Sequence, residues 1–176
     1  MYLTSDYRMM VEQTEKIIKG LKILLSLFEN AKGIIGIEDN KPEAIEKFKA
    51  LLGSDTRIEV RPLKTKYPQG AERQLIYATT KRKINSKMLP SDAGCIVENV
   101  GTVLATYYAV AENMPCIHRV VTVTGEAVAE PQDFDVRTGT SYSELLEAAG
   151  GLKCKAEKII SGGPMMGTAL FTTDIP

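Results

Sequence analysis

Three short polar segments of this chain hold the side chains best suited to binding a ligand: residues 38–40, 67–72 and 98–102. Each comes after a stretch typical of a β-strand and leads into a helical pattern. In an open parallel sheet, ligands gather beyond the carboxyl ends of the strands, so such connections are the first places to look for a site. Taken alone, each segment also has a simpler explanation as a turn or a helix cap.

The second segment, Tyr67-Pro68-Gln69-Gly70-Ala71-Glu72, offers the most varied chemistry. A tyrosine ring can stack on a flat ligand. A glycine before a helix lets that ligand approach the backbone and the unpaired amides of the first turn. The Glu72 carboxylate can accept hydrogen bonds from a ribityl or a nicotinamide group. On spacing alone, a proline–glycine turn is the simpler interpretation.

The other two segments are most simply explained as helix caps. Asn99 can cap the helix that begins near residue 100. Its amide, the Thr102 hydroxyl and the free amides of that helix can equally bind a flavin or its phosphate. Glu38-Asp39-Asn40 suits a cap with an acid in the first turn.

No constellation for nucleophilic catalysis or metal binding is visible. The single histidine, His118, has no partner pattern, and the three cysteines are too widely spaced for a disulfide framework or a metal site; they are Cys95, Cys116 and Cys154. A Walker loop and a GxGxxG motif are both missing from the sequence. We therefore expect no metal ligands within this chain.

The composition is that of an ordinary globular protein. The 176 residues include 44% hydrophobic and 25% charged side chains, and 22 Lys and Arg balance 22 Asp and Glu. This balance gives no overall field to attract nucleic acid, and no apolar run approaches the roughly 18 residues that cross a bilayer. The short basic run Lys81-Arg82-Lys83 favours a solvated helix end. Without a signal peptide, the cytoplasm is the expected location.

The elements that must position the three segments alternate between helices and strands. Helical patterns cover residues 6–28, 42–52, 71–81 and 100–112, and strand patterns cover residues 33–37, 57–63 and 95–97. The uniformly apolar runs at 33–37 and 95–97 predict buried strands, the first of them central and covered on both faces. Alternating strands and helices predict an α/β layer domain built on a parallel sheet.

The pattern changes after Pro115. Strand-like runs at residues 119–124 and 133–137 precede a capping box formed by Ser141 and Glu144, which opens a short helix. Ile159-Ile160 then predict a further strand. The order strand, strand, helix, strand predicts a small α+β module of the β-grasp type. We place the boundary near Cys116, which gives domains 1–116 and 117–176.

Six motifs, taken in order, resemble the C subunit of Rnf-type electron-transport complexes (RnfC). They are Tyr2-Leu3-Thr4-Ser5-Asp6, Gly36-Ile37-Glu38-Asp39-Asn40-Lys41-Pro42, Lys66-Tyr67-Pro68-Gln69-Gly70-Ala71-Glu72-Arg73-Gln74-Leu75, Val97-Glu98-Asn99-Val100, Val121-Thr122-Val123-Thr124-Gly125 and Ser161-Gly162-Gly163-Pro164-Met165-Met166-Gly167. The resemblance covers essentially the whole chain. More distantly, the chain is similar to the flavin- and NADH-binding subunit of respiratory complex I.

The resemblance implies a flavin mononucleotide (FMN) that exchanges a hydride with NAD(H) and passes electrons singly to two 4Fe-4S clusters. The cluster ligands would lie outside these residues. By motif, Tyr67, Gly70 and Glu72 would line the flavin and nicotinamide pocket, with Glu72 as the catalytic residue. Glu98, Asn99 and Thr102 would hold the flavin from the other loop. The parent subunit would be peripheral on the inner face of the cell membrane, with the other subunits of an ion-translocating oxidoreductase as its partners.

The resemblance also predicts that the chain is a middle portion of a longer subunit and is inactive alone. The family's glycine-rich phosphate loop would precede residue 1, and its cysteine-rich cluster domain would follow Pro176. Residues 117–176 resemble a soluble-ligand-binding β-grasp (SLBB) domain, expected to pack against partners and position them. The alternative is a non-catalytic ligand-binding or subunit-interaction module centred on that part. A stand-alone nucleotide-binding protein is disfavoured because no phosphate loop is present.

Overall fold

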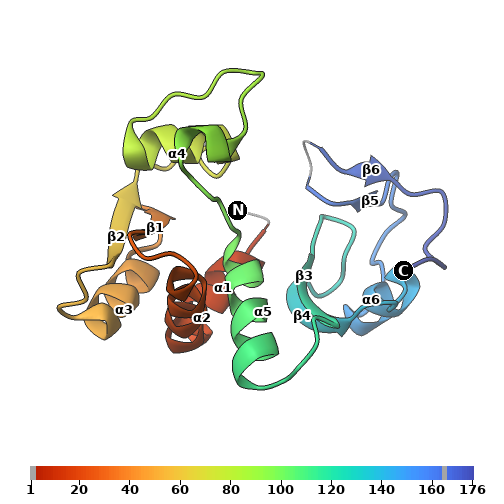
Figure 1. The fold of residues 1–176 in the computed structure, drawn as a ribbon. Helices are drawn as coiled ribbons and strands as arrows, with labels where there is room; N and C mark the ends of the chain where they lie inside the picture. Colours follow the sequence, from red (N-terminus) through yellow and green to blue (C-terminus); the bar gives the residue numbers. More distant parts are fainter. Residues whose placement is uncertain (1–2, 164–165) are drawn as a thin grey trace. The chain divides into compact units, whose positions relative to one another are not determined.

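The computed structural model describes residues 3–163 and 166–176 (Figure 1). Tyr2 of the first motif and Pro164-Met165 of the last lie outside these residues. The chain divides into two compact units. Asp6–Pro115 form the first unit, and residues 3–5 together with Cys116–Pro176 form the second. The sequence did not predict that residues 3–5 belong with the C-terminal part.

Helices and a pair of strands alternate in the first unit. In chain order these are α1 (Ser5–Glu12), α2 (Thr14–Ser26), β1 (Gly33–Glu38), α3 (Pro42–Leu52), β2 (Ile58–Leu63), α4 (Glu72–Thr80), the 3-10 helix η1 (Pro90–Ala93) and α5 (Val100–Ala111). The two strands are parallel, with Gly33 opposite Ile58 and Glu38 opposite Leu63. Their carboxyl ends therefore meet at one edge, where the residues that follow each strand lie close together.

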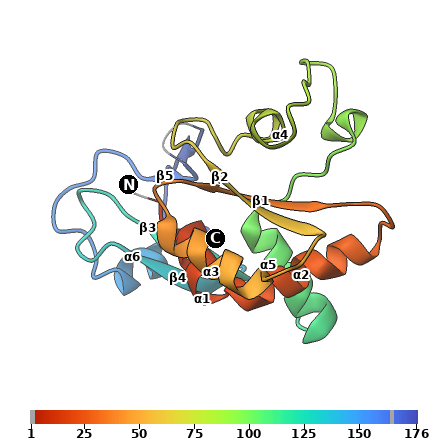
Figure 2. The same ribbon diagram turned by 90° about the vertical axis from the view of Figure 1, so that its left-hand side faces the viewer.

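Helices cover both faces of the β1–β2 pair, with α4 on one side and α2 and α3 on the other (Figure 2). On the α2–α3 side, Ile37 packs into a buried cluster with Phe48 and Ile58. On the α4 side, a Cβ added to Gly36 would lie 2.9 Å from Leu63 Cδ1 and 3.0 Å from Leu75 Cδ1. The missing side chain at Gly36 therefore lets α4 pack directly on the strand.

Helices α2 and α5 approach each other closely at another glycine. A Cβ on Gly20 would lie 2.2 Å from the Val103 carbonyl oxygen, so only glycine permits this crossing. Val103 and Leu104 of α5 are buried in the same cluster as Ile17 and Ile18 of α2. This packing fixes the axis of α5 and, with it, the position of the residues at its N-terminus.

A mixed helix and strand architecture is confirmed, but three details of the prediction are wrong. The predicted helix over residues 6–28 is two helices, because the backbone departs from helical geometry at Gln13, where φ is −120°. The Thr14 hydroxyl donates to the Met10 carbonyl oxygen beside this break, over 2.5 Å. Strand β1 pairs only with β2 among the described residues, so it is not central. Its apolar run is explained by helices on both faces.

The predicted buried strand at residues 95–97 is also wrong. These residues form no strand, and Ile96 is 68% exposed. Gly94, at φ 62°, ends η1 just before them. The carbonyl groups of Ala93 and Gly94 accept hydrogen bonds from the Arg82 guanidinium. The Arg82 side chain thus holds the backbone just before residue 95. The apolar run of residues 95–97 gave no sign of this contact.

The second unit is built from hairpins around one short helix. Its elements are β3 (His118–Val123), β4 (Gln132–Arg137), α6 (Tyr142–Ala148), β5 (Ile160–Ser161) and β6 (Thr168–Ala169). Strands β3 and β4 are antiparallel, as are β5 and β6. The predicted capping box of α6 is confirmed: Ser141 accepts from the Glu144 amide, and Glu144 accepts from the Ser141 amide. Among the described residues β5 pairs with β6 alone, so no continuous β-grasp sheet forms.

Candidate functional site

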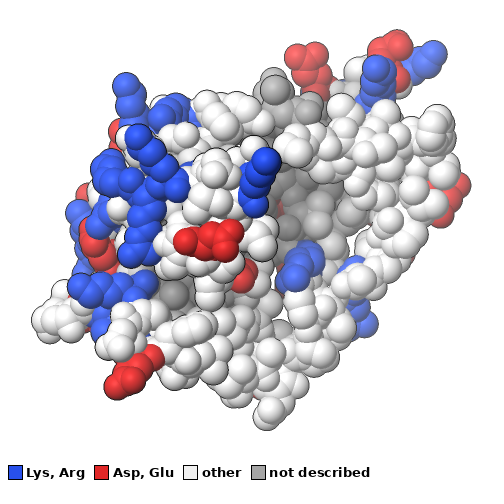
Figure 3. All heavy atoms as spheres, turned by 45° about the horizontal axis from the view of Figure 1, so that its top comes forward, with Lys and Arg blue, Asp and Glu red and all other residues white. Residues whose placement is uncertain are grey.

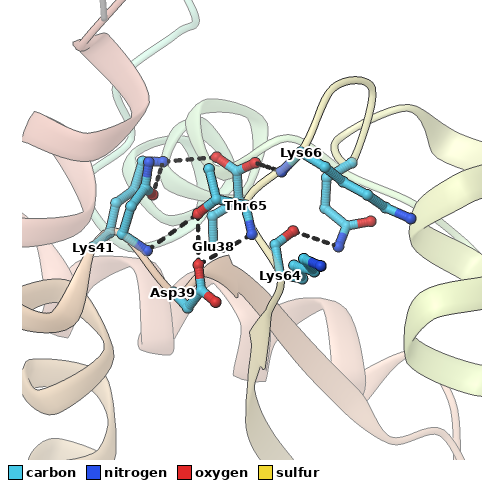
Figure 4. A network of polar contacts seen from close by, with 8 residues as sticks. Glu38, Asp39, Lys41, Lys64, Thr65 and Lys66 are labelled. Atoms are coloured by element: carbon cyan, nitrogen blue, oxygen red, sulfur yellow. Dashed lines mark hydrogen bonds and ion pairs between the residues drawn. The ribbon is translucent and has the colours of Figure 1, made fainter.

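The residues that follow β1 and β2 are tied together by a polar network at the shared edge of the strands (Figure 4). Asp39 Oδ1 accepts hydrogen bonds from the Thr65 amide at 3.0 Å and from the Thr65 hydroxyl at 2.6 Å. The Asp39 amide in turn donates to the Leu63 carbonyl oxygen over 2.7 Å. Two connections that are 26 residues apart are thereby held as one surface.

These hydrogen bonds keep Asp39 ionised. The Thr65 hydroxyl, and then the Thr65 amide, stabilise the charged carboxylate and hold the pKa of Asp39 below its usual value. An ionised acceptor makes both bonds stronger than neutral ones. The Asp39–Thr65 contact is therefore a clamp between the strand ends at neutral pH.

An ion pair strengthens the same edge. Lys41 Nζ lies 2.9 Å from Glu38 Oε2 and donates to Asn40 Oδ1 over 3.0 Å. The Lys41 side chain is only 15% exposed. The interpretation of residues 38–40 as a helix cap is wrong, because Lys41 is the N-cap of α3 and no side chain caps that helix. The segment instead joins β1 to the connection after β2.

That connection leads into the turn of residues 67–72, which is anchored by Gln69. The Gln69 side chain is buried, with Nε2 donating to the Lys64 carbonyl oxygen over 2.9 Å. Its backbone amide donates to the Lys66 carbonyl oxygen, also over 2.9 Å. The peptide bond between Tyr67 and Pro68 is cis. With Gln69 turned inward, the Tyr67 ring is left 71% exposed.

The rest of the turn is open to an incoming group. A Cβ on Gly70 would meet no atom within 4 Å. Glu72 is exposed as the first residue of α4, and its carboxylate has no hydrogen bond or ion pair among the residues the structure describes. No side chain caps α4, whose N-cap is Ala71. The turn therefore presents a flat ring, an accessible backbone, helix-end amides and a carboxylate.

The third segment, residues 98–102, forms the start of α5. The predicted cap is confirmed, because Asn99 Oδ1 accepts from the Gly101 amide over 2.8 Å. Asn99 Nδ2 donates to Asp6 Oδ2 over 2.9 Å, which joins the start of α5 to α1. Glu98 and Thr102 are exposed. Neither side chain makes a hydrogen bond within residues 3–163 and 166–176.

The structure thus connects the first two segments and leaves the third apart. Residues 38–41 and 64–69 share one network. No hydrogen bond or ion pair between described residues links Glu98, Asn99 or Thr102 to the turn of residues 67–72. Any joint site would be completed by a ligand that spans the two loops.

One polar atom in the turn lacks a partner. Gln69 Oε1 is buried and has no hydrogen-bond partner in the described part of the chain. A buried acceptor left unpaired costs about 1–3 kcal/mol. Sequence reasoning missed the role of this glutamine, as it missed the Thr65 clamp and the Asp6 contact to Asn99. A polar residue within a proline–glycine turn gives no periodic signal of burial.

Other site types find little support in the described residues. Within residues 3–163 and 166–176, no group of three or more His, Cys, Asp or Glu side chains is arranged to hold a metal ion. In the same part of the chain, no helix has both the length and the apolar character to cross a membrane. A shallow hollow of about 360 Å³ lies among α1, α2 and α3, lined by residues that include Val11, Lys47 and Leu51. None of the candidate residues lines it.

Comparison with known proteins identifies two family matches. Residues 1–108 match the family model of the Nuo51 FMN-binding domain, and residues 120–169 match the SLBB domain. All six candidate residues lie within the first match. The two matches fall on either side of Cys116.

Several curated proteins are similar over nearly the whole chain. The C subunit of the Na⁺-translocating ferredoxin:NAD⁺ oxidoreductase complex of Acetobacterium woodii is 45% identical over 175 residues, which are 99% of this chain and 40% of that protein. The C subunit of the proton-translocating ferredoxin:NAD⁺ oxidoreductase complex of Clostridium ljungdahlii is 46% identical, with 99% and 38% covered. The C subunit of the ion-translocating oxidoreductase complex of Haemophilus influenzae (strain PittEE) is 43% identical, with 99% and 27% covered. The resemblance to the C subunit of Rnf-type complexes is confirmed, and the chain spans about two fifths or less of these relatives' length.

Proposed function

The chain belongs to the family of the Nuo51 FMN-binding domain, and we propose that it forms the flavin- and NAD(H)-facing part of an ion-translocating ferredoxin:NAD oxidoreductase subunit. The observation that carries this proposal is the turn of residues 67–72. It lies beyond the carboxyl ends of two parallel strands and is anchored from inside by Gln69. Its Tyr67 ring, Gly70 backbone and Glu72 carboxylate are exposed.

The residues of this turn suit an FMN and a nicotinamide. Tyr67 offers a ring for stacking, and the open space at Gly70 admits a flat group against the backbone. The uncapped first turn of α4 offers amide donors to an anionic or carbonyl oxygen. FMN, when bound, supplies the conversion between hydride transfer from NADH and single-electron transfer to iron–sulfur clusters.

We assign each candidate residue a binding role toward these groups. Glu72 accepts hydrogen bonds from a nicotinamide amide or a ribityl hydroxyl, and its carboxylate is uncommitted among the described residues. Glu98 and Thr102 contact the flavin from the start of α5. Asn99 contacts the flavin through the amide hydrogen and oxygen lone pair that its bonds to Asp6 and Gly101 leave free.

We further propose domains that correspond to residues 1–116 and 117–176, the second acting as an SLBB-type module that positions partner subunits. Exposed apolar side chains in that part support an interaction role: Met166 is 90% exposed and Phe171 is fully exposed. The parent subunit would carry two 4Fe-4S clusters and lie on the inner face of the cell membrane within a larger complex.

The proposal is tested by Glu72→Gln in the full-length subunit assembled in its complex. The substitution keeps the side-chain shape but removes the charge. We expect NADH oxidation to fall about tenfold or more, equivalent to about 1.4 kcal/mol. Reduction of the clusters by a chemical donor should change less than twofold, because it bypasses hydride transfer. Glu46→Gln, on the exposed side of α3, is the matched control.

Equal losses in both assays would contradict the proposed role of Glu72 and would indicate damage to the fold. An unchanged rate of NADH oxidation would remove Glu72 from the site. Flavin content, measured from the absorbance of each purified variant, separates loss of the cofactor from loss of the hydride step.

A further inference from the structure

The first unit contains one stretch of positive charge, which begins on α4 and continues into the loop after it. Residues 73–91 include no Asp or Glu, although Glu72 and Asp92 flank them. The cations of this stretch, together called the basic face of α4 below, are Arg73, Lys81, Arg82, Lys83 and Lys87. All five are exposed. The sequence alone suggested only a solvated helix end at Lys81–Lys83.

The basic face of α4 gathers five cations, unpaired among the described residues, in one stretch that contains no acidic residue. No carboxylate of the described residues forms an ion pair with any of its five cations. Most other Lys and Arg residues of the unit do have such partners: Arg8, Lys16, Lys19, Lys22, Lys41, Lys47 and Arg61. Unpaired positive charge is therefore most concentrated here, although five other cations of the unit also lack an ion pair among the described residues: Lys32, Lys49, Arg57, Lys64 and Lys66.

Two arginines are held in place without being neutralised. The Arg73 guanidinium donates to the carbonyl oxygens of Ser86 and Met88 over 3.2 and 3.4 Å. The Arg82 guanidinium donates to the carbonyl oxygens of Ala93 and Gly94 over 2.6 and 3.1 Å. Carbonyl groups carry no net charge, so both side chains remain cationic. These bonds also fold the loop back on α4, which brings Lys87 close to Arg73.

Lys and Arg side chains gather on one side of the face shown in Figure 3, the side where Figure 1 places α4. Exposed apolar groups lie among them: Tyr77 is 44% exposed and Leu89 is 65% exposed. α4 alone is about 13 Å long at 1.5 Å per residue, so the surface exceeds the size of a single phosphate group. Aromatic side chains and arginines, both present on this surface, are enriched at protein interfaces.

We propose that the basic face of α4 docks an acidic protein, one that presents a surface rich in Asp and Glu. The inference rests on the proposed function, because it supposes that the chain works within a complex. Fixed guanidinium groups lose little conformational entropy on binding, so they suit a partner whose carboxylates also have fixed positions. A fluid lipid surface would need no such fixed array. Opposite charge would also steer the partner to its docking position.

The test uses the complex purified from its native membrane and a carbodiimide, which joins a lysine amine directly to a carboxyl group in contact with it. We expect Lys81, Lys83 or Lys87 to form cross-links to Asp or Glu of another polypeptide, identified by mass spectrometry. The matched controls are Lys32 and Lys49, which are exposed and form no ion pair among the described residues. The double substitution Lys83→Glu and Lys87→Glu should lower the remaining cross-links at Lys81 about tenfold.

Raising the salt concentration from about 0.05 M to about 0.5 M before the reagent is added should lower the yield several-fold, because salt screens surface charge. Cross-links only at Lys32 and Lys49, or none from the subunit's lysines, would overturn the proposal while leaving the complex intact. Binding of the chain to phosphatidylglycerol vesicles that the double substitution abolishes, without protein cross-links, would identify a lipid surface instead. If the subunit does not copurify with other polypeptides, the proposed function is contradicted. That result differs from an intact complex without cross-links, which contradicts only the docking proposal.

Discussion

Replacing Gln69 by glutamate should test whether the turn of residues 67–72 is anchored from inside. Gln69 is 5% exposed in the wild type, and its Nε2 donates to the Lys64 carbonyl oxygen over 2.9 Å. In Gln69→Glu this donor becomes an acceptor. A buried carboxylate would then face a carbonyl oxygen, and the folded protein would avoid this by keeping the carboxyl protonated.

The size of the effect follows from that protonation. Protonating a glutamate with an unfolded pKa of about 4.3 costs about 3.7 kcal/mol at pH 7, which sets an upper limit on the loss. A protonated carboxyl can still donate to the Lys64 carbonyl oxygen, so we expect a loss of about 2–3.5 kcal/mol at pH 7. Because burial would raise the folded-state pKa of the introduced carboxyl, the loss should be absent below about pH 4 and should grow by about 1.4 kcal/mol per pH unit above it.

Gln69→Met removes the Nε2 donor and the unpaired Oε1 acceptor together. The substitution loses one hydrogen bond worth about 0.5–1.5 kcal/mol and removes the unpaired Oε1, which costs about 1–3 kcal/mol where it is buried. These contributions nearly cancel, so stability should change by less than about 1 kcal/mol. A much larger loss would show that Oε1 has a partner, such as a buried water.

The assay is urea unfolding of the chain at several pH values, followed by far-ultraviolet circular dichroism, to which α1–α5 of the first unit contribute most of the helix. Gln132→Glu, at an exposed position, is the control and should change stability by less than about 0.5 kcal/mol. If Gln69→Glu were as stable as wild type at pH 7, the side chain would not be buried and the turn would not be anchored as described.

Three further substitutions test other parts of the fold. Thr65→Val removes the hydroxyl that is the main cause of the lowered Asp39 pKa, so the carboxyl of Asp39 should titrate at higher pH in an NMR titration. The pH at which the protein loses the stability tied to Asp39 should rise with it. An unchanged titration of Asp39 would contradict the clamp. Gly20→Ala should destabilise the chain by about 1–3 kcal/mol, because the new Cβ meets the Val103 carbonyl oxygen. Gly70→Ala, the control, has open space around it and should change stability by less than about 0.5 kcal/mol. Similar losses of stability for the two variants would refute the close crossing of α2 and α5. Arg82→Ala should speed tryptic cleavage after Lys83 and Lys87, because the guanidinium ties the loop to Ala93 and Gly94, while Arg119→Ala should leave the rate unchanged.

Local patterns predicted the elements whose causes are local. The capping box of α6 and the Asn99 cap of α5 each depend on residues within four positions of one another, and both are present. The alternation of strands and helices likewise predicted the parallel pairing of β1 and β2. These features follow from backbone geometry that a short window of sequence specifies.

Contacts between distant residues could not be predicted in this way. The Asp39–Thr65 clamp joins residues 26 positions apart, and the Asn99–Asp6 bond joins residues 93 positions apart. Neither produces a periodic signal. The end of η1 just before residues 95–97 is also fixed by a distant side chain, because Arg82, 11 positions before Ala93, donates to the Ala93 carbonyl oxygen.

The structure also separates the candidate residues by what they do for the fold. Asn99 caps α5 and contacts Asp6, so its loss would lower both stability and any ligand binding. An amide offers two donors and two acceptor positions, of which these contacts use one each, so the cap and a ligand contact are compatible. The other five have exposed side chains or, at Gly70, an open backbone: Tyr67, Gly70, Glu72, Glu98 and Thr102. Substitution there should cost less than about 0.5 kcal/mol of stability, so a lost activity at those positions would report on the ligand and not on the fold.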